Sequence, residues 1–410
     1  MKRAPRLSLQ QSGCFLPPRE TIEQGGLFMQ YRKLGNTEIS VGEISMGSEG
    51  LVNKSQKDAC ALVATALENG INYFDMYNSD PQLHRNLGLG LGSERKNVFI
   101  QGHLCTAWEN EQYLRTRDFE LTKKSFENMM RNIGTDYIDV GMLHCIDGEE
   151  DFRKVFEGPI YRYAQELKKA GVIKHIGISS HNPVTAKKAV ELGDIEVVMF
   201  SLNPCYDMVP PSENLEDLWA DESYENPLHN FDPVREDLYM TCAARGVGIT
   251  VMKAFGGGDL LDEKLSPFGV KLSPAQCLHY ALTRPAVATV LGGFHTPEEI
   301  RASVQYFETS EEERDYAPVL SHLNKHSFSG RCMYCGHCAP CPVRIDVASI
   351  NKYLNLAIAQ GFVPETVAMH YSLLEHHAGE CLSCGSCDRN CPFGVPAMRQ
   401  IALAKETFGY

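Results

Sequence analysis

The sequence predicts an α/β protein in which a parallel (β/α)8 barrel is followed by a smaller, mostly α-helical C-terminal domain. Eight short apolar runs alternate with amphipathic helical segments between residues 39 and 307. Most runs are apolar throughout rather than at every second position, which is typical of parallel strands buried on both faces. After residue 310 the alternation ends, and eight of the 15 cysteines follow in two short groups. Eight strand–helix units are the number that closes a barrel.

The predicted strands lie at 39–46, 72–75, 98–102, 137–143, 173–179, 197–201, 248–252 and 287–291. A capping residue precedes a proline at four predicted helix starts, Asn182-Pro183, Asp232-Pro233, Ser273-Pro274 and Thr296-Pro297, as expected at a helix N-terminus. An open, doubly wound sheet is the alternative. It would require a glycine-rich turn after the first strand, and the residues there read Met-Gly-Ser-Glu-Gly. The barrel is therefore the favoured fold.

We divide the chain into a disordered leader (1–28), the barrel (29–310) and a C-terminal domain that contains both cysteine groups (311–410). The leader contains basic residues and prolines but no continuous apolar segment, so it does not resemble a secretory signal.

The bulk composition excludes several classes of partner. Hydrophobic residues make up 43% of the 410 residues, and no run of 18 uncharged apolar residues occurs, so no membrane span is predicted. The net charge of −13 argues against nucleic acid and anionic membranes as partners. Seven cysteines are scattered singly, which favours a reducing, cytoplasmic location over a disulfide framework.

The two cysteine groups predict two 4Fe–4S clusters. The first group is Cys332, Cys335, Cys338 and Cys341-Pro342, and the second is Cys381, Cys384, Cys387 and Cys391-Pro392. The second spacing matches the bacterial ferredoxin run, in which the fourth cysteine binds the other cluster. The crossed arrangement then assigns Cys332, Cys335, Cys338 and Cys391 to one cluster and Cys341, Cys381, Cys384 and Cys387 to the other. Zinc is the alternative, although zinc ligands usually come as two pairs separated by a long loop.

Four segments of the barrel resemble the aldo/keto reductase family: 31–37 (YRKLGNT), 70–75 (GINYFD), 136–144 (DYIDVGMLH) and 177–180 (GISS). The resemblance covers about residues 29–307, and the cysteine groups resemble the C-terminal extension of iron–sulfur members of that family. It implies the barrel fold and a redox activity, and it says little about the substrate.

The resemblance implies a catalytic tetrad of Asp, Tyr, Lys and His, in which NADPH delivers hydride and the tyrosine protonates the substrate oxygen. Asp75 and His144 match two of these positions, whereas the tyrosine position is Asp80 and the lysine position is His103. Tyr77 is nearby and is either a substitute phenol or a packing residue. Because Asp75, His103 and His144 end three consecutive predicted strands, we expect them to form an acid/base group. A facial metal triad made from the same three residues is an alternative.

Positions that bind the nicotinamide cofactor in the family are also altered. The carboxamide-binding Ser-Asn pair reads Ser179-Ser180, and Gly293, Phe294 and Glu299 stand where Lys, Ser and Arg usually hold the 2′-phosphate. We therefore do not expect NADPH specificity, and NAD(P)H and flavin both stay open. Gly256 and Gly257 after the seventh strand, and Gly293 after the eighth, could bind a phosphate or form tight turns. Lys253 is either an anion-binding residue or a salt-bridge partner.

These observations predict an anaerobe-type oxidoreductase that reduces a small organic substrate, either a carbonyl compound or an activated double bond. Its electrons would come from NAD(P)H, or one at a time through the clusters from an external donor such as ferredoxin or flavodoxin. Two alternatives stay open: a non-redox lyase or isomerase with structural clusters, and an electron-carrier subunit.

Overall fold

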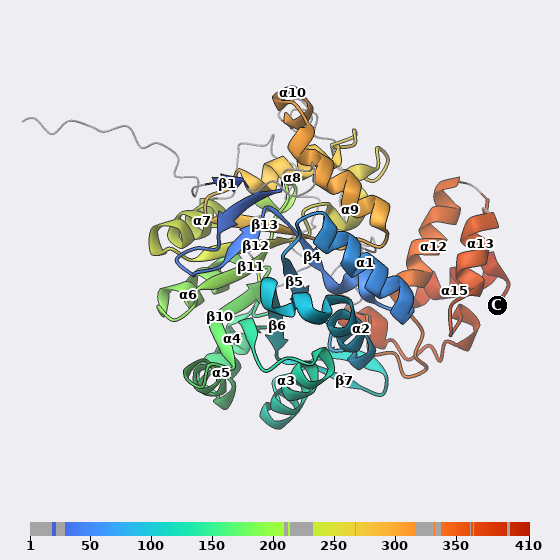
Figure 1. The fold of residues 1–410 in the computed structure, drawn as a ribbon. Coiled ribbons are helices and arrows are strands. Elements are labelled where there is room, and N and C mark those ends of the chain that lie inside the picture. The colour runs from blue at the N-terminus through green and yellow to red at the C-terminus, as the bar shows by residue number, and fades with distance from the viewer. Residues whose placement is uncertain are drawn as a thin grey trace, which may run out of the picture.

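The computed structural model describes residues 19–21, 29–208, 212–213, 233–266, 268–316, 332, 338–360, 362–363, 365–391 and 394–410. Its central feature is a closed barrel of eight strands, surrounded by helices (Figure 1). The predicted (β/α)8 fold is therefore confirmed, and the open-sheet alternative is excluded.

All neighbouring strands of the barrel are parallel. In order around the ring they are β4 (Ile44–Gly47), β5 (Tyr73–Met76), β6 (Phe99–Leu104), β9 (Ile138–Leu143), β10 (Ile173–Ser180), β11 (Val197–Ser201), β12 (Gly248–Met252) and β13 (Val287–Gly292). Each overlaps a predicted strand. Their carboxyl ends point the same way, so the loops that follow them share one face of the barrel.

The helices around the barrel are α1 (Gln56–Glu68), α2 (Pro81–Leu91), α3 (Phe119–Ile133), α4 (Glu149–Phe156), α5 (Pro159–Lys169), α6 (Pro183–Glu191), α7 (Pro233–Arg245), α8 (Pro274–Leu282) and α9 (Pro297–Val304). Three predicted caps, Asn182, Ser273 and Thr296, accept N–H groups of the first turn as expected. The fourth, Asp232, lies outside the described residues. Short 3₁₀ helices are η1 (Ser48–Leu51), η2 (Gly92–Asn97), η3 (Tyr206–Met208), η6 (Gly256–Leu261), η7 (Gln305–Glu308) and η8 (Ala378–Glu380).

The first predicted strand, 39–46, is divided between two sheets. β3 (Ser40–Gly42) pairs with β2 (Gln30–Lys33) in an antiparallel sheet, and only the following residues enter the barrel as β4. Glu43 lies at the division and accepts a hydrogen bond of 2.6 Å from the buried guanidinium of Arg32. Arg32 also donates to the carbonyls of Leu282 and Val287, and so ties the small sheet to the barrel.

Of the leader predicted at 1–28, the structure describes only β1 (Arg19–Thr21), which pairs antiparallel with β2. The other residues of the leader lie outside the described part.

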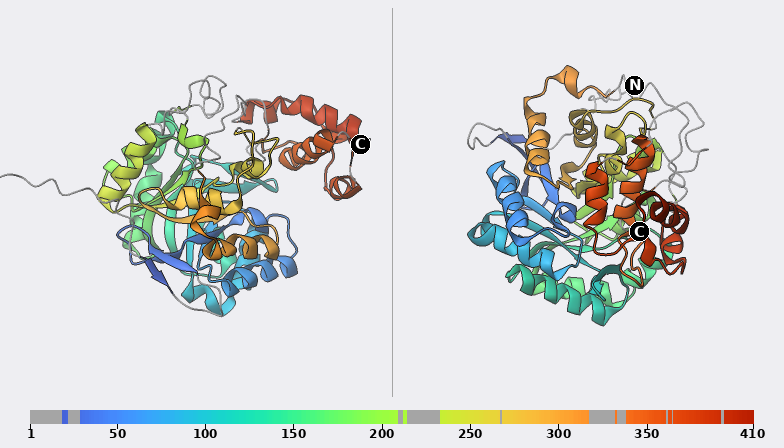
Figure 2. Two further views of the ribbon diagram at one scale, coloured as in Figure 1. Left: turned by 90° about the horizontal axis from the view of Figure 1, so that it is seen from above. Right: turned by 90° about the vertical axis from the view of Figure 1, so that its right-hand side faces the viewer.

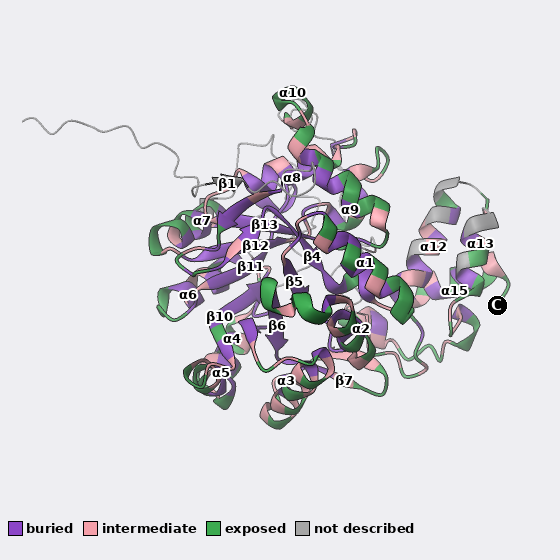
Figure 3. Cartoon of the chain, in the orientation of Figure 1, coloured by how far each residue is buried: buried purple, intermediate pink, exposed green. Residues whose placement is uncertain are grey.

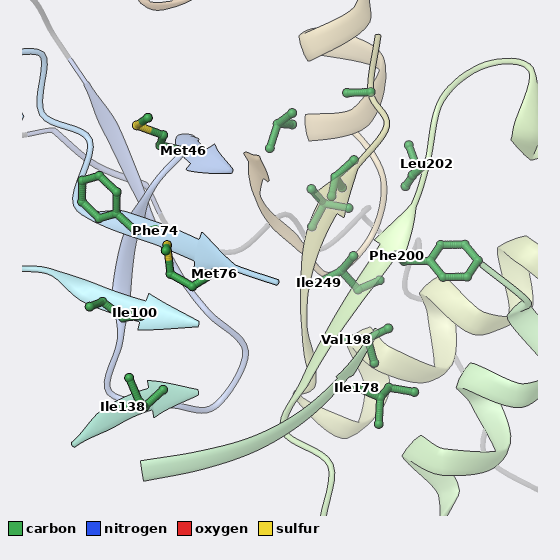
Figure 4. Packing of buried hydrophobic residues seen from close by; sticks show 14 of the residues in the cluster. Met46, Phe74, Met76, Ile100, Ile138, Ile178, Val198, Phe200, Leu202 and Ile249 are labelled. Atoms are coloured by element: carbon green, nitrogen blue, oxygen red, sulfur yellow. The ribbon is translucent and has the colours of Figure 1, made fainter. Parts of the chain in front are cut away.

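The main core lies between the strands and the surrounding helices. Figure 4 shows its close packing, with Phe74 and Met76 of β5 and Val198 and Phe200 of β11 among the buried side chains. A smaller cluster, including Tyr73, Met142 and Met199, fills the inside of the barrel. Burial is high along the strands and falls toward the outer faces of the helices (Figure 3). The barrel is thus a packed scaffold, and side chains available to a ligand are expected in its loops.

The C-terminal domain consists of short helices beside the carboxyl face of the barrel (Figure 2). They are α12 (Val347–Gln360), α13 (Glu365–Ser372), α14 (Ser386–Asn390) and α15 (Ala397–Phe408), and α10 (Glu311–Arg314) precedes them. One apolar cluster contains residues of both parts: Tyr206, Leu260, Phe268 and Leu272 of the barrel loops, and Ile350, Leu354, Tyr371 and Ile401 of the C-terminal domain. No helix among the described residues is long and apolar enough to span a membrane.

A two-stranded hairpin, β7 (Thr106–Glu109) and β8 (Gln112–Arg115), follows β6. Its turn residues Asn110 and Glu111 both have positive φ, 50° and 60°, the conformation that matches the twist of a two-residue hairpin. The hairpin lies on the carboxyl face, on the side of the C-terminal domain (Figure 1).

Candidate active site

Asp75, His103 and His144 are in direct contact at the carboxyl face. His103 places Nε2 at 2.8 Å from Oδ1 of Asp75 and Nδ1 at 2.7 Å from Nδ1 of His144. Asp75 and His103 lie near the ends of β5 and β6, and His144 follows β9 directly. All three residues are buried, with at most 8% of their surface exposed. The sequence predicted this group, and the structure arranges it as a line rather than around a common point.

Gln101 and its neighbours hold Asp75 in place. Nε2 of Gln101 donates to the same Oδ1 at 2.6 Å, and its carbonyl oxygen accepts from the hydroxyls of Tyr73 and Thr250 at 2.8 and 3.1 Å. Oδ1 of Asp75 is thus shared by the amide of Gln101 and Nε2 of His103. A buried carboxylate with fixed donors is a rigid anchor for the histidine.

Tyr113 extends this line, and sequence reasoning missed it. It is the second residue of β8, and its hydroxyl lies 2.7 Å from Nε2 of His144. The two rings meet edge to face, at a centroid distance of 6.2 Å. The available signal was Asn110, a turn residue between two short runs that suit strands, which marks a hairpin over the site.

One arrangement of protons satisfies every contact in this line. In it, His103 donates from Nε2 to Asp75, so in its neutral form Nδ1 has no proton and accepts from Nδ1–H of His144. Nε2 of His144 is then bare and accepts the hydroxyl proton of Tyr113. Each contact thus contains one proton, and every donor points toward Asp75. We call the four residues the relay. Both ring nitrogens of His103 are within hydrogen-bond distance of a relay partner.

Of the other predicted catalytic residues, Tyr77 lies beside the relay and Asp80 lies at the start of α2. The Tyr77 ring is nearly parallel to His144 at a centroid distance of 6.1 Å, and its hydroxyl bonds to the carboxylate of Glu49. Asp80 caps the N-terminus of α2, where it accepts the Gln82 N–H at 2.8 Å. Its carboxylate thus caps this helix.

Charged groups adjoin the relay on the β4 side. Glu49, on the loop after β4, interacts electrostatically with Lys253 and Asp75. Desolvation, and then Asp75, raise the pKa of Glu49, while Lys253 opposes the shift. Gly50 allows this loop to lie against the loop after β13, because a Cβ atom there would come within 1.5 Å of the Phe294 carbonyl oxygen. Lys253 directly follows β12 and has a positive φ of 65°, a strained conformation that the surrounding structure must maintain.

Ser179 and Ser180 differ in their contacts. Ser179 accepts the Cys145 N–H at 2.7 Å and lies 3.3 Å from Nδ1 of His144, so it adjoins the relay. Ser180 is fully buried, and its hydroxyl is engaged by the Ile146 carbonyl at 2.7 Å and the Asp147 carboxylate at 3.1 Å. Ser180 thus connects the loops after β9 and β10.

The glycine loops form tight turns. The N–H groups of Gly256 and Gly258 donate to Lys253 and Phe255 at 2.9 Å each, so these two amides are not free for a phosphate. Gly257 lies between them with φ 74°, and Gly293 lies against the side chain of Glu49. At the start of α9, Glu299 accepts the His295 N–H at 2.7 Å. A carboxylate thus stands where the family usually has an arginine, and it would repel a 2′-phosphate.

A second polar group adjoins the relay. Cys145, Asp147 and His181 bring one ligand-type atom each within 4.8 Å of one another. Sγ of Cys145 lies 3.1 Å from Oδ2 of Asp147, and Nδ1 of His181 lies 3.0 Å from the same oxygen. The guanidinium of Arg115, 3.0 Å from Sγ, supplies positive charge beside it. Burial alone lowers the pKa of His181, but Asp147 overrides it and raises the value to about 9. The positive charges of protonated His181 and of Arg115 offset the negative charge of Asp147.

Four of the predicted cluster ligands line one hollow of the C-terminal domain: Cys341, Cys381, Cys384 and Cys387. Apolar side chains, among them Val343, Ile345, Met398 and Ile401, complete its wall. Convergent thiols in an apolar cradle fit a 4Fe–4S cluster, and these four cysteines are one set of the predicted crossed arrangement. Of the other set, Cys332, Cys338 and Cys391 pack against the same apolar core, and Cys335 lies outside the described residues. None of the described cysteines forms a disulfide.

Comparisons with known proteins support the assignment of both the barrel and the C-terminal domain. Residues 38–271 match the model of the aldo/keto reductase family, and residues 329–395 match a 4Fe-4S dicluster domain. Similar curated proteins include the uncharacterized oxidoreductase YqkF of Bacillus subtilis, 25% identical over 68% of this chain and 90% of its own length. Pyridoxal 4-dehydrogenase of Microbacterium luteolum is 22% identical over 68% of this chain and 93% of its own length. Among solved structures, the holo form of aldo-keto reductase AKR11C1 from Bacillus halodurans covers 71% of this chain and 96% of its own, with a TM-score of 0.56 and 23% identity.

Proposed function

The chain belongs to the aldo/keto reductase family and has a 4Fe-4S dicluster domain, and from this premise we propose that it reduces a small carbonyl compound or an activated double bond. The observation that carries the proposal is the relay from Asp75 to Tyr113. It ends in a phenol, the group that protonates the substrate oxygen in the family, although that phenol comes from a different element. Tyr113 thus replaces the function that the sequence has lost at position 80.

The relay delivers one proton in each cycle. In its acid form His144 is protonated on both nitrogens and donates from Nε2 to Tyr113, whose hydroxyl then points to the substrate. The positive charge of His144 is then stabilised by Asp75, which is connected to it through the hydrogen bonds of His103. When Tyr113 gives its proton to the substrate oxygen, it takes the proton of His144, and the relay returns to the arrangement in the structure. Burial raises the pKa of Tyr113, so a free tyrosinate is unfavourable and the two transfers are coupled.

The source of the electrons has two candidates. Glu299 and the tight glycine turns weaken the usual phosphate site, so NADH fits better than NADPH, and a flavin is a further candidate. The clusters, when bound, supply electrons one at a time, which requires an external donor of the ferredoxin or flavodoxin class. In both cases two electrons and two protons convert a carbonyl to an alcohol, and Tyr113 supplies the proton on oxygen. We expect a reducing, cytoplasmic location in an anaerobe-type metabolism.

The test is turnover of the anaerobically purified full-length protein with NADH, NADPH or reduced methyl viologen and a panel of small aldehydes, ketones and enones. We expect product by mass spectrometry with at least one donor. His103→Ala should lower kcat by about 100-fold or more. His175→Ala is the matched control, because His175 is a buried histidine that also pairs with a carboxylate, at the start of β10. Equal rates in the His103 and His175 variants would contradict the proposal.

The same assay separates the alternatives. Turnover without any electron donor would favour a lyase or isomerase with structural clusters. Clusters that are reduced and reoxidised while no organic product forms would favour an electron carrier.

A further inference from the structure

The β7–β8 hairpin contacts the relay and the C-terminal domain through neighbouring residues. Tyr113 reaches His144, and Gln112, one residue earlier, donates from Nε2 to the carbonyl oxygen of Cys341 at 2.6 Å. Consecutive strand residues point to opposite faces, so the hairpin presents one side chain to the barrel and the next to the cysteine domain. The two contacts are joined by a single peptide bond.

The contact with the C-terminal domain has a second part. Glu111, in the hairpin turn, forms a salt bridge with Arg344, which also pairs with Glu375 at 3.1 Å. The backbone N–H of Arg344 donates to the same Cys341 carbonyl at 2.9 Å, so this carbonyl accepts two hydrogen bonds. The salt bridge is solvent-exposed and contributes little energy by itself, but it restricts the hairpin to one position against Arg344.

The carbonyl that Gln112 contacts belongs to one particular cysteine set. Cys341 lines the hollow together with Cys381, Cys384 and Cys387. A donor that neutralises a carbonyl dipole beside a cluster stabilises the more negative, reduced state, because hydrogen bonding around a cluster sets its potential. Gln112 therefore acts on one of the two clusters.

We infer that the hairpin couples the Cys341–Cys381–Cys384–Cys387 cluster to the relay, and that Gln112 positions this cluster for single-electron exchange with the substrate at Tyr113. The inference rests on the proposed function. A low-potential one-electron donor protein supplies two electrons in succession, the substrate accepts both, and the two protons come through the relay and from solvent.

The test compares Gln112→Leu, which keeps the side-chain bulk but has no N–H donor, with Gln165→Leu on the surface of α5. Both are purified anaerobically as full-length protein with iron content checked. An EPR redox titration measures each cluster, and turnover is measured with reduced methyl viologen and with NADH. In Gln112→Leu we expect the ratio of reduced to oxidised cluster at fixed potential to fall for one cluster only. The expected fall is about threefold to tenfold, where tenfold corresponds to about 59 mV for one electron.

Viologen-driven turnover should fall at least tenfold in Gln112→Leu, whereas NADH-driven turnover, where present, and all properties of Gln165→Leu should stay unchanged. Unchanged potentials of both clusters would overturn the inference. A shifted potential with unaltered viologen-driven turnover would also overturn it, since Gln112 would then only hold the domains together. If the unmodified protein turned over no substrate with any donor, the proposed function would fail, and the titration would still report whether Gln112 acts on one cluster.

Discussion

Tyr113→Phe is the substitution that separates a catalytic relay from a packed cluster of polar side chains. It removes one oxygen atom and keeps the ring, so the edge-to-face contact with His144 stays. Nε2 of His144 loses its 2.7 Å partner. The loss of one such hydrogen bond destabilises the fold by about 0.5–1.5 kcal/mol, which is too little to unfold a barrel of this size.

The expected effect on catalysis is much larger than the effect on stability. A positioned general acid contributes about 10²–10⁴-fold to the rate, so kcat should fall by about that factor while KM changes little. The assay is anaerobic turnover with the best donor, and circular dichroism and the visible cluster spectrum verify the fold. Tyr77→Phe is the comparison, because its hydroxyl bonds to Glu49 rather than to the relay, and it should lower kcat far less. A Tyr113→Phe enzyme within about threefold of the unmodified rate would refute the assignment.

Three further predictions concern stability and the clusters. Glu43→Ala removes the carboxylate from the buried Arg32 guanidinium, and should lower the free energy of unfolding by about 3–5 kcal/mol in chemical denaturation. The His181–Asp147 pair stabilises the fold below pH 6.5 and is lost as pH rises through about 9. The free energy of unfolding should therefore fall by at most about 3 kcal/mol across that window, and the melting temperature should fall with it. In His181→Gln the melting temperature should fall less steeply with pH. Cys384→Ser should reduce the iron content from about eight to about four atoms per chain, and an unchanged content would exclude Cys384 as a ligand.

The barrel was predictable because its strands are buried on both faces. A run such as 197–201 has no polar face, and such runs between helical segments permit few other folds. The first strand was placed less well, since the apolar pattern of 39–46 does not reveal that Glu43 pairs with Arg32 and divides it between two sheets.

The candidate site was predictable only in part. That Asp75, His103 and His144 lie together follows from their places at the ends of adjacent strands. Their order in a line depends on side-chain rotamers, which the sequence does not display. The capping role of Asp80 was readable from a local signal, because an Asp before Pro81 marks a helix N-terminus. Tyr113 was missed because its hairpin is an insertion between strand and helix, outside the repeating pattern.

The most direct measurement is a double-mutant cycle between two members of the relay, His103→Ala and Tyr113→Phe, with kcat as the readout. Residues that act as one unit lose their function together. If the four residues form a proton relay, the double variant should be no more than about threefold slower than the slower single variant. If the two losses multiply instead, His103 and Tyr113 act independently, and the relay does not exist.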